Sequence, residues 1–175
     1  RQLGHWAAAA PGRPLSMTVN ISPRQLDNPD FLRELRQIIE RTGIAPTSLC
    51  LELTESALMN PRMDIVGTLE QARAMGVYVA IDDFGTEHSS LARLRDLPVE
   101  VLKIDKSFVD GLPAEAGDTA IVSSILSMAF AMGKHVIAEG VEHIAQVQAL
   151  RSMGCRVAQG YLFSRPVPPE ALLPL

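Results

Sequence analysis

The sequence is poor in the features that mark secreted, membrane-spanning or zinc-binding proteins. Its two cysteines, Cys50 and Cys155, lie beside or within apolar runs and lack the spacing of a zinc site, so we expect buried thiols in a reducing compartment. No signal-peptide pattern is present. The longest apolar tract, Ala120–Met132, is interrupted by serines and is too short to span a membrane. We therefore expect a cytoplasmic domain without membrane contact of its own, any anchor being supplied by other domains of a longer parent protein.

Charge and size narrow the function classes further. The net charge is −4, and no basic patch indicates binding to a nucleic-acid polymer. With 175 residues and 47% hydrophobic content, the chain can bury the core of one domain, or most of one. It starts at Arg1 inside a helix-like segment, which indicates a piece of something longer.

Short apolar runs alternate with helix-like segments along the chain. The runs that we interpret as strands are Leu15–Ile21, Leu49–Leu53, Val77–Ile81, Val99–Ile104, Lys134–Ala138 and Val157–Gln159. This alternation is typical of parallel βα units, so we predict an α/β fold, an incomplete (β/α)8 barrel with about six βα units. An eight-stranded barrel needs about 250 residues, so roughly two strands are expected upstream.

Polar side chains stand at or just after the carboxyl ends of these runs. They are Asn20, Glu52, Glu55, Asp82, Asp83, Lys103, Asp105, Glu139, Glu142 and Gln159. In a (β/α) barrel the carboxyl ends of the strands gather at one mouth. Acids, amides and one lysine gathered there predict a metal-dependent active site.

The adjacent pair Asp82 and Asp83 is the most informative of these positions. Two neighbouring acids repel each other and lose solvation if partly buried, which is usually tolerated only beside a cation. Taken alone, the pair is explained equally well as a cap of the next helix. Asn20 alone is more simply a turn former, and Lys103 alone a lysine that extends to solvent. The recurrence at successive strand ends, and no single position, favours the metal site.

Six segments, in this order, resemble the successive motifs of the EAL domain, a family of bacterial cyclic di-GMP phosphodiesterases. The segments are TVNISPRQL, LELTES, IDDFGT, LKIDKSFV, VIAEGVE and GCRVAQGYLFSRP. The resemblance covers nearly the whole chain. It implies a modified TIM barrel with one antiparallel strand, which hydrolyses cyclic di-GMP to linear pGpG with Mg²⁺ or Mn²⁺. Residues 1–175 then form an EAL-type domain that lacks roughly its first two strands.

The resemblance also implies which residues hold the metals. Asn20, Glu52 and Asp82 would ligate a first ion. Asp83 and Asp105 would serve a second ion or its waters. These oxygen donors suit a hard divalent cation, and a two-metal site can stabilise both the attacking and the leaving oxygen of a phosphodiester.

Four further residues receive roles from the same resemblance. Lys103 would lie beside the attacking water and Glu139 close to the metals, and we take these two as the catalytic pair. Gln159 would hold the far side of the site. Glu55 would anchor the loop Asp82–Ser90 by accepting hydrogen bonds from that loop, for example from Thr86 or Ser89.

The chain departs from the family pattern in two ways. No Glu-Ala-Leu motif precedes Asn20, so the first metal lacks one ligand, and we expect weak or absent hydrolysis by this chain. Glu87-His88 stands where the family usually has Gly-Tyr, so the loop is expected to take another path or to be disordered.

Two other functions remain open from the sequence. One is a non-catalytic receptor for cyclic di-GMP or a protein-docking module, and the other is a metal hydrolase that acts on a different phosphodiester. Degenerate relatives typically lose the metal acids, so the presence of Glu52, Asp82, Asp83 and Glu139 favours the enzyme. An incomplete barrel also exposes a sheet edge, which predicts pairing with a second copy as a homodimer or a loosely packed first unit.

Overall fold

The computed structural model describes residues 2–10, 12, 15–59, 65–86 and 91–172. Two expectations lie outside these residues: Ser89 as a donor to Glu55 and the altered loop at Glu87-His88. The structure describes the elements on either side of both positions.

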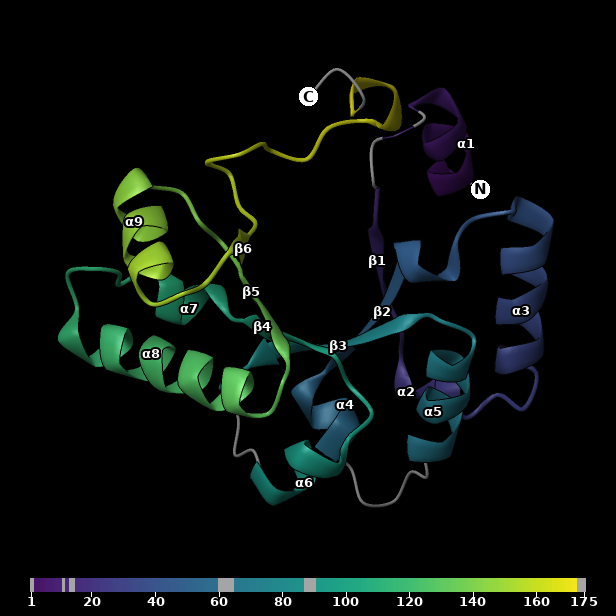
Figure 1. The fold of residues 1–175 in the computed structure, drawn as a ribbon, viewed down its shortest axis with the longest axis horizontal. Coiled ribbons are helices and arrows are strands. Elements are labelled where there is room, and N and C mark those ends of the chain that lie inside the picture. The colour runs from purple at the N-terminus through teal and green to yellow at the C-terminus, as the bar shows by residue number, and fades with distance from the viewer. Residues whose placement is uncertain (1, 11, 13–14, 60–64, 87–90, 173–175) are drawn as a thin grey trace.

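Six parallel strands form one curved sheet, paired in the order in which they occur in the chain (Figure 1). The strands are β1 (Met17–Asn20), β2 (Leu49–Thr54), β3 (Tyr78–Phe84), β4 (Val101–Ile104), β5 (His135–Ala138) and β6 (Val157–Ala158). The sheet curls into half of a barrel, which confirms the predicted incomplete α/β barrel. All six predicted strands are present, with ends shifted by a few residues.

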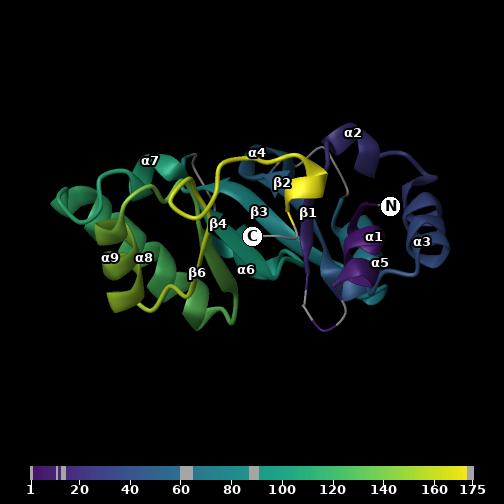
Figure 2. The ribbon, with the colours of Figure 1, turned by 90° about the horizontal axis from the view of Figure 1, so that it is seen from above.

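Helices surround the sheet, the longer ones on its outer side and the shortest ones at the end where the strands finish (Figure 2). They are α1 (Gln2–Ala9), α2 (Pro23–Leu26), α3 (Phe31–Thr42), α4 (Glu55–Met59), α5 (Val66–Ala74), α6 (Leu91–Asp96), α7 (Lys106–Val109), α8 (Ala116–Ala131) and α9 (Ile144–Ser152), with 3₁₀ turns η1 (Pro46–Ser48) and η2 (Pro169–Ala171). Figures 1 and 2 both place α8 and α9 beside β4–β6, and α3 and α5 beside β1–β3. The short helices α2, α4 and α7 were not predicted, because one turn of helix has no apolar period. Across the described residues, no helix has both the length and the apolar character needed to cross a membrane.

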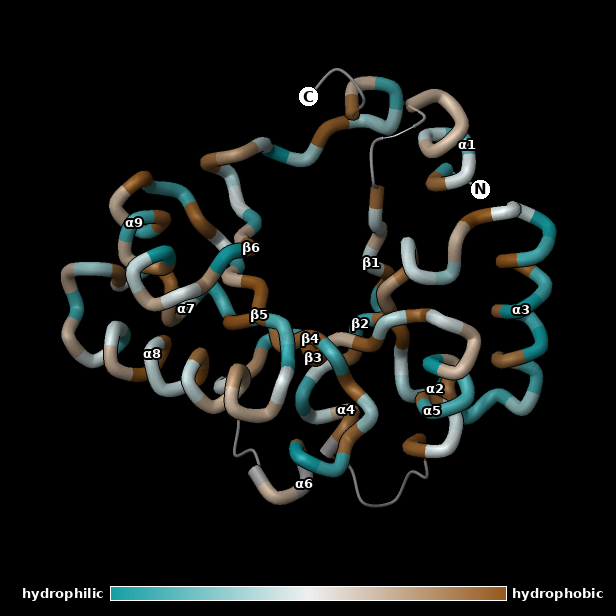
Figure 3. Tube along the Cα trace, in the orientation of Figure 1, coloured by the Kyte–Doolittle hydropathy of each residue, from teal (hydrophilic) through white to brown (hydrophobic). Residues whose placement is uncertain are grey.

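The middle strands are buried on both faces, as expected for a parallel sheet between two layers. Every residue of β2 before Thr54 is buried, and β4 is buried from Leu102 onward. The edge strands differ: most of β1 is exposed, and Val157 in β6 is 53% exposed. Hydrophobic residues accordingly concentrate along the central strands and the inner helix faces (Figure 3). This core fixes the positions of the central strand ends.

Strand β3 continues further than the sequence predicted. The apolar run was expected to end at Ile81, but the strand includes Asp82 and Asp83 and ends at Phe84. The pairing with β4 shifts register between Ile81 and Phe84, and Asp83 has φ 54°. A bulge of this kind bends a strand and redirects a side chain, and it costs backbone energy at a residue that is not glycine. Buried Phe84 holds the far side of the bulge in the core.

The segment after β6 packs tightly against the segment after β5. The Val141 amide donates to the Gln159 carbonyl at 3.0 Å, and the Leu162 amide donates to the Val141 carbonyl at 3.0 Å. Gly160 lies between them, and a Cβ atom there would lie 2.2 Å from the Val141 backbone. Further on, the chain crosses to the first helix, where the Trp6 indole donates to the Pro169 carbonyl at 3.0 Å (Figure 1).

Gly160→Ala is therefore expected to separate the segment after β6 from the segment after β5. The added methyl group overlaps backbone atoms that cannot move aside, so we expect a loss of about 1–3 kcal/mol in the free energy of unfolding. Denaturant unfolding followed by circular dichroism measures it. Gly117→Ala in α8 is the matched control, because a Cβ there meets nothing within 4 Å, and it should be neutral or stabilising by up to about 1 kcal/mol. Equal effects of the two changes would contradict the close approach.

Candidate functional site

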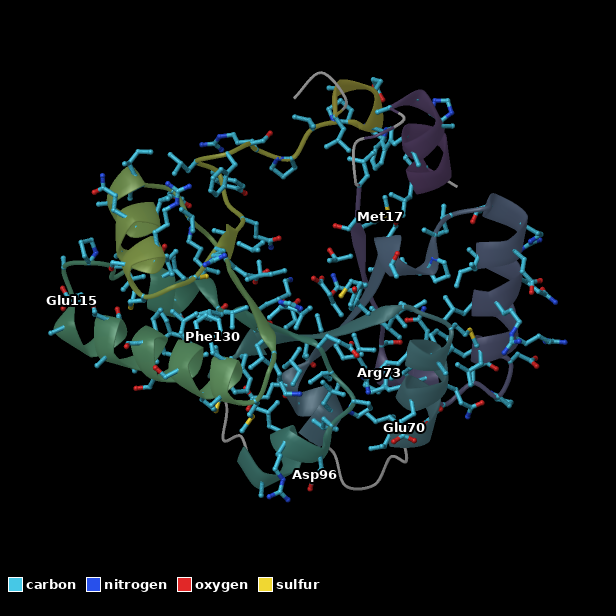
Figure 4. All side chains as sticks on the ribbon, in the orientation of Figure 1. Met17, Glu70, Arg73, Asp96, Glu115 and Phe130 are labelled. Carbon is cyan, nitrogen blue, oxygen red and sulfur yellow. The ribbon has the colours of Figure 1, made fainter. Side chains whose placement is uncertain are left out.

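Each strand of the sheet brings one polar side chain to the same edge. Asn20 ends β1, Glu52 lies in β2, Asp82 in β3 and Lys103 in β4, while Glu139 and Gln159 directly follow β5 and β6. The register pairs Asn20 with Glu52 and Thr54 with Asp82, so the groups lie at similar heights along neighbouring strands. By contrast, the labelled side chains of Glu70, Asp96 and Glu115 lie on the outer helices, away from this edge (Figure 4).

Lys103 is the centre of the site. Its ammonium nitrogen lies 2.9 Å from Glu52 Oε1, 2.7 Å from Asp82 Oδ1 and 2.6 Å from Glu139 Oε1. The Lys103 and Glu52 side chains are each 5% exposed, and those of Asp82 and Glu139 are 16% and 14% exposed. Three carboxylates from three strands therefore share one buried ammonium group.

These close contacts change the pKa values of Lys103 and Glu139. Burial alone lowers the pKa of Lys103, but hydrogen bonds to Asp82, Glu139 and Glu52 outweigh burial and raise the pKa above its ordinary value. Burial raises the pKa of Glu139; Lys103 partly opposes this rise, and the nearby charges of Asp82 and Glu52 add to it. Lys103 therefore carries its proton at neutral pH, and the acids around it retain an excess of negative charge.

Glu52 Oε1 provides a test of whether a cation fits here. It is a buried oxygen whose partner among the described residues is the Lys103 ammonium, 2.9 Å away, which Asp82 and Glu139 share. Burying three carboxylates around one positive charge is costly unless a further cation compensates them. Carboxylate oxygens at this density are the ligands that Mg²⁺ and Mn²⁺ prefer, so the residues present fit a divalent cation.

A second group of acids lies next to the first. One carboxylate oxygen from each of Asp82, Asp83 and Glu139 lies within 4.8 Å of the others. Burial, followed by the charges of Asp82 and Asp105, raises the pKa of Asp83. Burial also acts to raise the pKa of Asp105, but hydrogen bonds from Ser107 outweigh it and hold the value below normal. The predicted second-metal residues Asp83 and Asp105 are thus neighbours that interact directly.

Asp105 has a local role as well. Its side chain accepts a hydrogen bond from the Ser107 amide at 3.0 Å and so caps α7. This explains why a helix begins immediately after β4. The cap fixes the direction in which the chain leaves Lys103.

Glu55 lies under the segment that follows β3. Its side chain belongs to a residue that is 2% exposed, and Oε2 accepts a hydrogen bond from the Gly85 amide at 3.0 Å. The predicted partner segment is therefore correct. Thr86, named beforehand as an example of a donor, directs its hydroxyl to the Asp83 carbonyl at 2.9 Å. Ser89, the other example, is outside the described residues.

Gln159 contacts the acidic group from the last strand. Its side-chain amide donates to Glu139 Oε1, the same oxygen that receives Lys103. Within the part of the chain that the structure describes, the Asn20 side chain forms no hydrogen bond, so its convergence with Glu52 and Asp82 stays a prediction supported by the strand register.

A groove of about 660 Å³ opens beside Glu139 and Gln159. Its lining includes Lys106, Glu142, Tyr161 and Arg165. The Arg165 guanidinium lies 4.8 Å from the centre of the Tyr161 ring, and Lys106 Nζ lies 2.5 Å from Glu142 Oε1. The groove thus places two cationic side chains and one aromatic ring next to the acids.

The sequence pattern did not indicate Lys106, Tyr161 or Arg165. Each lies inside one of the six family motifs, but none stands at a strand end, where polar side chains predicted the site. Gln146 was also missed, although it is 1% exposed and lies close to the same loops. Its position near the start of a helix gave no signal beyond ordinary capping.

Relatives in other organisms share most of this chain. Residues 1–166 match the EAL domain family. The chain is 44% identical over 158 residues to "Cyclic di-GMP phosphodiesterase NbdA" of Pseudomonas aeruginosa, which covers 90% of this chain and 20% of that protein. The chain spans about a fifth to a quarter of the length of the curated relatives that it matches.

Solved structures agree in fold. The PaMucR phosphodiesterase in complex with c-di-GMP superposes with a TM-score of 0.90 at 38% identity, over 98% of this chain and 69% of that chain. The manganese and cy-diGMP complex of Klebsiella pneumoniae BlrP1 gives a TM-score of 0.84 at 30% identity, over 94% of this chain and 42% of that chain. The sequence match, the parallel half-barrel and the acids at its strand ends together establish that the chain belongs to the EAL domain family.

Proposed function

We propose that this chain carries the site of a phosphodiesterase that converts cyclic di-GMP to linear pGpG with Mg²⁺ or Mn²⁺. The single observation that carries the proposal is the buried group of three carboxylates that share the one positive charge of Lys103. The named activity of NbdA and the c-di-GMP bound to PaMucR support the choice of substrate. The manganese bound in the BlrP1 complex supports a divalent ion.

In this proposal the acids divide between two ions. Asn20, Glu52 and Asp82 hold the first, and Asp83 and Asp105 serve the second or its waters. Two such ions lower the pKa of a water molecule and stabilise the attacking and leaving oxygens of an in-line displacement. Glu139 lies next to both sets of acids, since one of its carboxylate oxygens is within 4.8 Å of an oxygen of Asp82 and of an oxygen of Asp83.

Lys103 acts as a fixed cation and not as a base. Its pKa is raised by its hydrogen bonds with carboxylates, so at neutral pH it has no free electron pair with which to accept a proton. It can instead polarise a nearby attacking water through its charge and offset negative charge on the phosphoryl oxygens. It also holds Glu52, Asp82 and Glu139 in one arrangement, so that fewer side chains must reorganise during the reaction.

The groove beside Glu139 suits the remainder of a nucleotide. Lys106 and Arg165 offer positive charge to phosphate, and Tyr161 offers a ring face to a base. Gln159 connects this groove to the acids through its hydrogen bond with Glu139. The same side chains would bind cyclic di-GMP in a receptor without turnover, so catalysis itself must be measured.

Asp82→Asn tests the enzymatic proposal. The change keeps the shape of the side chain but removes a negative charge next to Lys103, so we expect formation of pGpG to fall by about 100-fold or more. Product is measured by chromatography with Mn²⁺ and excess protein, so that slow turnover is still detected. Asp96→Asn, an exposed acid in α6, is the matched control and should leave product formation unchanged. Tight binding of cyclic di-GMP without any product by the longer parent protein would favour the receptor.

Cation binding should weaken as the solution becomes acidic. Asp83 and Glu139 must lose their protons to bind a cation, and burial raises the pKa of both. As pH falls through these raised values, protons displace the cation, so the apparent Mn²⁺ affinity falls at a higher pH than ordinary carboxylates would produce. Titration calorimetry from neutral to acidic pH measures the affinity. The double change Asp83→Asn and Glu139→Gln should remove most of this pH dependence; an unchanged profile would contradict the assignment.

Lys103→Met should make folding depend on a divalent cation. Removing the ammonium leaves Glu52, Asp82 and Glu139 together and largely buried, so we expect a loss of about 3–5 kcal/mol in the free energy of unfolding. Added Mn²⁺ should restore part of this loss, because a bound ion supplies the missing positive charge. Thermal unfolding with and without Mn²⁺ measures both effects, and Lys106→Met at the exposed groove is the control. A cation-independent loss would count against a metal site.

A further inference from the structure

Gln146 is a buried polar residue near the start of α9. It is 1% exposed, and both ends of its amide are used. Oε1 accepts hydrogen bonds from the Glu142 and His143 amides, each at 2.8 Å. Nε2 donates to the Val109 carbonyl at 3.0 Å.

These bonds connect two segments that leave neighbouring strands. The segment 139–143 follows β5 and contains Glu139. Helix α7, which Val109 ends, follows β4 and begins at the cap Asp105. One side chain therefore ties the loop that carries Glu139 to the helix that follows Lys103 and Asp105.

Helix capping explains only part of this arrangement. A glutamine at the third position of a helix commonly accepts a hydrogen bond from the amide of the capping residue, here His143. Capping does not require the bond from the Glu142 amide, and it does not involve Val109 at all. The bond to the Val109 carbonyl joins positions 37 residues apart in the chain, so it is a tertiary contact.

A second connection between the same segments is much more exposed. Lys106 forms an ion pair with Glu142, and its side-chain stem packs so closely over Gly140 that a Cβ there would lie 2.3 Å from it. The Lys106 and Glu142 side chains are 48% and 36% exposed, and exposed ion pairs contribute little. The buried amide of Gln146 is the connection shielded from water.

We propose that Gln146 is a positioning residue for the reaction, one that fixes the loop 139–143 against α7 and thereby holds Glu139 at its distance from Lys103. The proposal rests on the function proposed above. Gln146 touches neither substrate nor the reacting atoms; it acts through Glu139 and the wall of the groove that Glu142 forms. Losing its bonds lets the loop move while the core strands remain in place.

Two variants separate positioning from capping. Gln146→Met keeps the length of the side chain and loses all three hydrogen bonds. Gln146→Glu keeps the acceptor for the Glu142 and His143 amides but cannot donate to the Val109 carbonyl when ionised. Gln148→Glu is the matched control, because Gln148 is an exposed glutamine in the same helix. If Gln146→Met does not fold, Gln146→Glu carries the test.

The measurements are kcat and KM for cyclic di-GMP with Mn²⁺, Mn²⁺ affinity by calorimetry, and amide hydrogen exchange, all per folded molecule. We expect kcat to fall about tenfold or more for both Gln146 variants, because a small displacement of a reacting group is costly. Exchange should become faster in segment 139–143 for Gln146→Met, whereas Gln146→Glu should keep the Glu142 and His143 amides protected. Gln148→Glu should match the unchanged chain in every readout.

The outcomes distinguish this proposal from the one on which it rests. Unchanged kcat per folded molecule in both variants, with faster exchange spread over the whole chain, would show a purely structural role and overturn it. If the unchanged chain forms no pGpG even within its longer parent protein, the proposed function fails, and Mn²⁺ affinity then decides about Gln146. A weaker affinity together with faster exchange in segment 139–143 supports positioning, and an unchanged affinity overturns it.

Discussion

The site depends on one buried ammonium group that three carboxylates share. Lys103, in β4, contacts Glu52, Asp82 and Glu139 at hydrogen-bond or ion-pair distance. It therefore links the carboxyl ends of β2, β3 and β5 to β4. Without it, these acids would repel one another in a region where water screens charge poorly. With it, repulsion is reduced but not removed, because a single positive charge faces three negative ones. This arrangement explains both the burial of the acids and their readiness for a cation.

The parallel sheet makes such burial possible. In β2 and β4 apolar residues fill both faces, and the buried polar side chains, Glu52 and Lys103, stand towards the carboxyl end. The backbone then turns sharply where the acids need to be placed: Asp83 adopts φ 54°, and Gly85 adopts φ 99°, where a Cβ would lie 3.1 Å from the Phe108 ring. Glu55 holds that turn from below through the Gly85 amide. Core packing, backbone geometry and a buried acid therefore act together on one short segment.

How far the sequence could predict this structure depends on the range of each interaction. Apolar runs and the acids that follow them are local signals, and they located all six strands and the groups that meet Lys103. The extension of β3 through Asp82 and Asp83 was not predicted, because two adjacent acids look like the end of a strand when the neighbouring strand is unknown. Gln146 was missed for the same reason: its bond to the Val109 carbonyl is formed between segments that only the fold brings together. The contact of Glu55 with its loop was anticipated through the family motif and not through any local pattern.

The excess of acid over base determines how the rest of the site must be built. Carboxylates that repel one another move apart unless something opposes them, and a divalent cation can do so only after the ligands are already close. Two kinds of interaction oppose the repulsion. The Lys103 ammonium attracts Glu52, Asp82 and Glu139, and tertiary hydrogen bonds hold the neighbouring loops in place. Glu139 is the most demanding case, since it follows its strand instead of lying within it, and the described residues give its backbone one bond to the sheet, from its amide to the Ile104 carbonyl at 3.1 Å. Two further side chains hold its loop. Gln159 donates to the Glu139 carboxylate, and Gln146 joins the Glu142 amide to the Val109 carbonyl. These restraints act beyond the end of β5, where strand pairing has ended.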